Sequence, residues 1–171
     1  MKPSMHAFSV ELFSNALGNL SWILEKGAAS AASRKIEPAV LLAARLAPDM
    51  LPLTRQIQIA GDIAKSSVAR LAGQEPPRYE DNETTIEQLR ARLARTIDFL
   101  KSVPASAFEG AETRDIKLPA GERTLEFKGL AFLQTWAIPN VFFHVTTAYN
   151  ILRHNGVDLG KRDFIGGGRE M

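Results

Sequence analysis

Two side chains on one apolar segment, Asn140 and His144, have the clearest capacity for chemistry in this chain. The stretch 140–156 is apolar nearly all round and ends at Gly156, so the helix that it predicts must be enclosed by other elements. Residues four apart share a helix face, and the other neighbours of His144 on that face are small or apolar. A neutral imidazole in this position can bind a divalent metal, whereas the amide of Asn140 is a poor substitute for a second imidazole.

Side chains of two earlier segments could complete a site with this histidine. His6 is in register with apolar residues of its segment, and Gln58 and Asp62 lie four residues apart beside an apolar stripe. We therefore predict that His6, Gln58 or Asp62, Asn140 and His144 converge inside the protein.

The same residues also have a purely structural interpretation, which we favour over a metal ligand. A single inward histidine is more often hydrogen bonded to an amide, a carboxylate or a carbonyl group than to a metal. Trp136 and Tyr149 could line a pocket beside His144, although such aromatic side chains mainly fill cores.

Composition excludes several classes of function. The chain has 171 residues, 45% of them apolar and 23% charged, which is typical of one soluble domain spanning residues 1–171. The net charge is only +2 and no Lys/Arg run is interleaved with aromatic residues, so we expect no nucleic-acid partner. The sequence has no cysteine, which excludes disulfides, thiolate nucleophiles and cysteine-based metal sites. Any thiol chemistry would therefore need a thiol from a cosubstrate.

Nothing in the sequence predicts insertion into a membrane. The first residues lack the apolar core of a signal peptide, and the longest apolar stretch, 129–143, is interrupted by polar residues and proline. It is too short to span a bilayer. We expect a cytoplasmic protein without a membrane partner.

Four long helices can be placed by apolar residues at spacings of three and four. The first ends at Gly27, with 28–33 either extending it or fraying, and the third begins with a capping box of Thr84 and Glu87. Pro139 predicts a kink or break in the last helix. The helices cover residues 3–26, 49–73, 84–103 and 129–154.

The remaining segments connect these helices. A short turn is expected at 39–46 and a polar connection at 74–83. Alternating apolar residues at 114–128 predict a β-hairpin with a four-residue turn, 119–122. The tail, 157–171, is expected to be partly flexible. The sequence therefore predicts an all-α four-helix bundle with a small β-hairpin before the last helix.

The sequence also resembles a bacterial family of domains of unknown function in the DinB/YfiT-like metalloenzyme superfamily. The resemblance rests on segments 47–51, 56–62, 79–84, 139–157 and 159–164. It implies an up-down-down-up four-helix bundle, often dimeric, that binds a divalent metal through three histidines. Some relatives transfer low-molecular-weight thiols, and one type isomerises maleylpyruvate.

The resemblance also assigns positions to the expected metal ligands. In the superfamily, two histidines one turn apart precede an Arg-x-x-Gly ending on the last helix. Arg153 to Gly156 matches that ending, which places His144 at the second histidine position and Asn140 at the first. The third histidine is expected on the second helix, which has none, so two of the three ligands are missing.

These observations lead to three hypotheses about function. The first is a small-molecule-binding bundle with a degenerate metal site and no cofactor. The second is a transferase or isomerase that uses a low-molecular-weight thiol and a divalent zinc, nickel or iron ion at His144. There the metal would lower the pKa of the thiol while Tyr149 or Asp62 handled protons. The third is a homodimer with a purely structural role.

Overall fold

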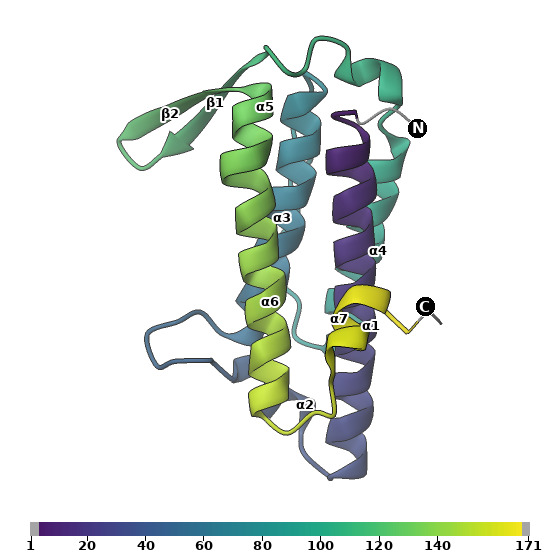
Figure 1. Cartoon of the computed structure of the whole chain (residues 1–171). Helices are drawn as coiled ribbons and strands as arrows, with labels where there is room; N and C mark the ends of the chain where they lie inside the picture. The colour runs from purple at the N-terminus through teal and green to yellow at the C-terminus, as the bar shows by residue number, and fades with distance from the viewer. Residues whose placement is uncertain (1–3, 169–171) are drawn as a thin grey trace.

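Helices form most of the protein, and a small antiparallel hairpin is inserted before the last long helix (Figure 1). The structure is a computed structural model and describes residues 4–168. The elements are η1 (Ala7–Glu11), α1 (Leu12–Ser33), α2 (Pro38–Ala43), α3 (Leu53–Leu71), α4 (Ile86–Ser102), η2 (Ala105–Phe108), β1 (Asp115–Ala120), β2 (Arg123–Lys128), α5 (Gly129–Phe132), η3 (Leu133–Ala137), α6 (Ile138–His154) and α7 (Lys161–Gly166).

Four long helical segments lie side by side: α1, α3, α4 and the continuous segment from α5 to α6 (Figure 1). α3 packs against α6 and α4, and α1 packs against the same two helices. The apolar stripe of α3 shows why: its members recur at spacings of three and four and are all fully buried. They are Leu53, Ile57, Ala60, Ala64, Val68 and Leu71. In the described part of the chain, no helix is long and apolar enough to cross a membrane.

Proline and glycine explain where the observed helix boundaries differ from the predicted ones. α3 begins at Leu53 rather than near residue 49, because Pro52 disfavours helical backbone at the residue before it. α1 continues past Gly27 to Ser33, so of the two alternatives left open for 28–33 the extension is the one observed. A Cβ at Gly27 would lie 3.2 Å from Cδ2 of Leu152, so this glycine permits close packing against α6.

Two further local predictions are corrected. The capping box of α4 consists of Thr85 and Gln88, one residue later than predicted, since Ile86 is the first helical residue. Pro139 neither breaks nor ends the last helix. It lies in the first turn of α6, directly after the wider π-helical turn η3, and the chain stays helical from α5 to α6.

The hairpin lies where the sequence predicted it, at one end of the bundle, and projects away from the long helices (Figure 1). Its turn is tighter than predicted, because Ala120 pairs with Arg123 and leaves two residues in the loop. Gly121 supplies the positive φ of 62° that this turn needs.

Within the predicted tail, residues 161–166 form the short helix α7, which is anchored on α1. The Asn19 side chain donates hydrogen bonds to the carbonyl groups of Phe164 and Ile165, at 2.9 and 2.7 Å. Asp163 accepts from the Trp22 indole at 3.1 Å. The rest of the predicted flexible tail, 169–171, lies outside the described residues.

Gly129 offers a test of this packing. A Cβ there would lie 1.9 Å from the carbonyl oxygen of Ala111, so Gly129→Ala should lower the free energy of unfolding by about 1–3 kcal/mol. Gly18→Ala is the matched control, because nothing lies within 4 Å of its Cβ position. It should raise stability by about 1 kcal/mol. Urea unfolding followed by circular dichroism checks both, and an unchanged midpoint for Gly129→Ala would contradict this packing.

Candidate functional site

His144 of α6 is hydrogen bonded to Gln56 of α3. Its Nδ1 lies 2.7 Å from Oε1 of Gln56, and the Gln56 amide nitrogen donates to the carbonyl oxygen of Leu51 at 3.0 Å. A carbonyl oxygen can only accept, so the NH₂ group of Gln56 must face Leu51 and its oxygen must face the ring. Nδ1 of His144 therefore carries a proton and donates it.

The second ring nitrogen of His144 is the free one. Burial lowers the pKa of this imidazole below its ordinary value, which favours the neutral ring at physiological pH. With the proton on Nδ1, Nε2 carries a lone pair. Nε2 has no hydrogen-bond partner among residues 4–168 and is not one of their fully buried unpaired atoms. A hydrogen-bond acceptor thus reaches solvent at this point of α6.

Asn140 lies one turn before His144, as predicted, but it is engaged by its own helix. Its amide nitrogen donates to the carbonyl oxygen of Trp136 at 2.7 Å. Its amide oxygen and its second N–H remain available to a ligand. Across residues 4–168, no three His, Cys, Asp or Glu side chains are grouped so that they could hold a metal.

The structure does not bring Gln58 or Asp62 to His144. Gln58 donates to Glu83 at 2.8 Å, and Asp62 is paired with Arg92 at 2.9 Å. Each helical residue rotates the side chain by about 100°, so Gln58 lies on nearly the opposite side of α3 from Gln56.

The other predicted site residues are also placed elsewhere. His6 lies 3.7 Å from Glu11, with its ring edge against Phe108. The Trp136 ring stacks on Phe132 at 5.5 Å. Tyr149 meets Phe164 of α7, with ring centroids 5.8 Å apart. These contacts account for the three side chains as parts of the packing, without a role beside His144.

Gln56 is the functional candidate that the sequence-based prediction missed. It lies four residues before Ala60 and seven before Ile63, on a buried face of α3, and is only 2% exposed. A glutamine at a position of the apolar stripe was the available signal, because a buried amide needs partners.

A groove of about 470 Å³ lies between α6 and the connection that precedes α3, and neither His144 nor Gln56 is among its lining residues. Phe143, on the groove wall, meets the His144 ring edge to face at 5.2 Å, and Thr147 shares the helix face of His144. Every lining residue is uncharged: Leu46, Met50, Phe142, Phe143, Thr146, Thr147 and Asn150. Phe143 is 56% exposed, which is unusual for so large an apolar side chain.

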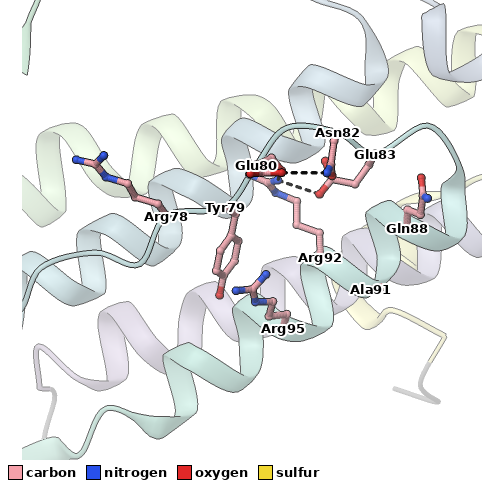
Figure 2. A pocket seen from close by; sticks show the side chains of 9 residues that line it. All are labelled: Arg78, Tyr79, Glu80, Asn82, Glu83, Gln88, Ala91, Arg92 and Arg95. Atoms are coloured by element: carbon pink, nitrogen blue, oxygen red, sulfur yellow. Dashed lines mark hydrogen bonds and ion pairs between the residues drawn. The ribbon is translucent and has the colours of Figure 1, made fainter.

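A second polar cluster lies on the other side of α3, centred on Arg92 of α4 (Figure 2). The Arg92 side chain is 2% exposed and pairs with Asp62, Asp81 and Glu83, each at 2.9 Å. It also donates to the carbonyl oxygen of Glu80 at 2.8 Å. These contacts tie the connection between α3 and α4 to both helices.

Charge interactions keep the carboxylates of this cluster ionised. Burial would raise the pKa of Glu83, but hydrogen bonds from Arg92 and Gln58 outweigh it and hold the pKa below its ordinary value. Desolvation would likewise raise the pKa of Asp81, but Arg55 and Arg92 outweigh it and lower that pKa too.

The pocket beside the Arg92 cluster has an aromatic wall that cations of the protein already cover. A pocket of about 520 Å³ lies along the connection (Figure 2). Tyr79 on its wall has Lys65 over its ring at 3.7 Å and Arg95 at 3.9 Å. Because the ring is covered by cations of the protein itself, we assign this cluster a structural role.

Comparison with known proteins supports the family resemblance. Residues 5–165 match a family described as "Domain of unknown function (DUF1993)". The crystal structure of a DinB family member protein from Shewanella denitrificans is similar, with a TM-score of 0.90 and 42% sequence identity. The match covers 98% of this chain and 94% of that one. No curated protein matches the sequence.

The Arg92 cluster should make stability depend on pH. Because the pKa values of Asp81 and Glu83 are lowered on folding, their contribution is present above about pH 5 and is lost as pH falls through the folded-state values. Arg92→Met should lower the free energy of unfolding at pH 7 by about 2–3 kcal/mol, less than a fully buried pair because its partners are partly exposed. It should also flatten the dependence between about pH 5 and 3. Denaturant unfolding between about pH 5 and 3 measures both effects, and the exposed Arg123→Met is the control. If Arg92→Met leaves the pH dependence of stability unaltered, the structural role of the cluster is contradicted.

The protonation of His144 can be observed directly. Long-range ¹H–¹⁵N spectra of the labelled protein at pH 7 should show a protonated Nδ1 and an unprotonated Nε2. Gln56→Leu removes the acceptor and should lower the Nδ1–H population. A dominant Nε2–H form in the unmodified protein would show that the hydrogen bond is absent.

Proposed function

The chain belongs to the DUF1993 family and has a DinB-like fold, and on this premise we propose that it is a small-molecule-binding bundle with a degenerate metal site. The observation that supports the proposal most directly is the hydrogen bond between Nδ1 of His144 and Oε1 of Gln56. It leaves one imidazole nitrogen of α6 without a partner among the described residues. An uncharged groove, whose lining includes Phe143 and Thr147 of the same helix, offers room for a ligand.

The donors near His144 do not fit the three-histidine site implied by the superfamily. One imidazole nitrogen remains, the Gln56 oxygen already accepts from the ring, and the Asn140 amide nitrogen is bound to Trp136. Amides are weak ligands for zinc, nickel or iron compared with imidazole. The transferase or isomerase hypothesis, which needs a resident metal, therefore gains no support from this donor set.

The predicted up-down-down-up order of helices belongs to the same proposal. The connection 72–85 lies along the bundle and joins the end of α3 to the start of α4 (Figure 1). Such a long crossover between consecutive helices allows them to run in the same direction.

A homodimer is the second candidate, because apolar side chains are exposed on one face. Leu46 and Phe143, which both line the groove, are 38% and 56% exposed, and dimer interfaces are rich in such side chains. A dimer across this face would cover the groove, so the two candidates make different predictions. Cytoplasmic location stays a prediction from the sequence.

Ligand binding at the groove can be tested with toluene as an apolar probe. Added to ¹⁵N-labelled protein, it should move the amide signals of Thr146, Thr147 and Asn150. Phe143→Ser should weaken this binding at least about threefold by removing apolar contact area. Val40→Ser is the control, since Val40 is 58% exposed and lies outside the groove lining.

Metal analysis and light scattering complete this test. Protein purified without chelator or affinity-column metal should contain less than stoichiometric zinc, nickel and iron. A stoichiometric metal that is lost on His144→Ala would overturn the proposal in favour of a metalloenzyme. Dimers that dissociate in Phe143→Ser, with no toluene response, would instead favour the structural homodimer.

A further inference from the structure

We propose a second ligand site, beside η1, for a small zwitterion that carries one carboxylate and one ammonium group, such as an amino acid. The site is a pocket of about 400 Å³ between η1, the start of α1 and the last turn of α4. Its lining residues are His6, Val10, Glu11, Ser14, Asn15 and Lys101. None of them lines the groove on α6, so this site is separate from the proposed function and goes beyond it.

A π-helical turn builds one wall of this pocket. In η1 the backbone N–H of Leu12 donates to the carbonyl oxygen of Ala7, five residues earlier, which is the pattern of a π-helix. In a regular α-helix, residues five apart point about 140° away from each other. The π turn instead brings His6 and Glu11 together, with Nδ1 3.7 Å from Oε1. Such turns inside helices are frequent at functional sites.

Two opposite charges in the lining are left for a ligand. The 3.7 Å between His6 and Glu11 is longer than a hydrogen bond, and the Glu11 side chain is 55% exposed. Among residues 4–168, the Glu11 carboxylate accepts no hydrogen bond and the Lys101 ammonium forms no ion pair. The two groups line the same pocket without pairing with each other. The pocket therefore offers a negatively charged acceptor and a positively charged donor.

This combination of charges determines which class of ligand fits. A simple anion is attracted by Lys101 and repelled by Glu11, and a simple cation meets the reverse. An uncharged apolar molecule finds only one apolar side chain in the lining, that of Val10. A zwitterion can place its carboxylate at Lys101 and its ammonium group at Glu11, so it gains both charge-assisted contacts. The volume of about 400 Å³ is within the range of small-molecule sites.

Probes that differ only in their charged groups test this selectivity. 4-Aminobutyrate, butyrate and butylamine have nearly the same chain, and glycine and 6-aminohexanoate vary the spacing of the two charges. Added to the ¹⁵N-labelled full chain at pH 7 and low salt, the best amino carboxylate should move the amide signals of Val10, Ser14 and Asn15. It should bind at least about threefold tighter than butyrate or butylamine, as expected for one further charge pair at a partly exposed site. Added salt should reduce this preference.

Two uncharged variants show whether the charges of the pocket cause the preference. Glu11→Gln should lower the affinity for the amino carboxylate to that for butyrate, and Lys101→Gln should lower it to that for butylamine. Both positions are exposed, so neither change should unfold the protein. Lys161→Gln, at an exposed position outside the lining, is the control and should leave the preference unchanged.

Three results would overturn this site. The first is that no amino carboxylate of the series moves the three amide signals. The second is that butyrate or butylamine binds the unmodified protein as tightly as the best amino carboxylate. The third is that the preference survives in both Glu11→Gln and Lys101→Gln. The toluene titration at the groove is independent of all three, so the proposed function is tested separately.

Discussion

The Gln56 side chain is the interaction on which the site depends. It links the carbonyl group just before α3 to the imidazole of α6, across two helices that pack against each other. Gln56 is buried, and leaving a buried amide without partners costs about 1–3 kcal/mol. The same contact that satisfies this amide determines which nitrogen of His144 carries the proton. Gln56 therefore contributes to the stability of the fold and also sets the protonation of the His144 ring.

α3 carries two polar faces with opposite characters. Toward the connection 72–85, Asp62 belongs to a cluster in which Arg92 meets three carboxylates. The ion pairs of this cluster hold the connection between α3 and α4 in place. Toward α6, Gln56 holds a neutral ring whose second nitrogen has no partner among the described residues. An acceptor without a protein partner can bind a donor from outside, whereas a cluster of paired charges holds the fold together.

Sequence patterns predicted the helical architecture because apolar spacing reports directly on burial, as the fully buried stripe of α3 shows. The alternation of apolar residues along 114–128 likewise predicted the hairpin. The sequence left a choice open where tertiary contact decides the outcome: Gly27 could end the first helix or lie within it, and in the structure it lies within it and permits close packing against Leu152. At the site, His144 with Asn140 one turn before it was predicted, but its partner was placed on the wrong side of α3. Two residues separate Gln56 from Gln58, and only the packing of α3 on α6 shows which one faces the ring.

The central claim is that Gln56 fixes a neutral His144 with a free Nε2 and leaves too few donors for a resident metal. A high-resolution crystal structure of the full chain grown with zinc tests it most directly. The account predicts that the Gln56 amide bridges the Leu51 carbonyl and Nδ1, with no zinc bound by three protein donors at His144. A zinc ion on Nε2 held by two further protein ligands, with Gln56 turned toward it, would contradict the account.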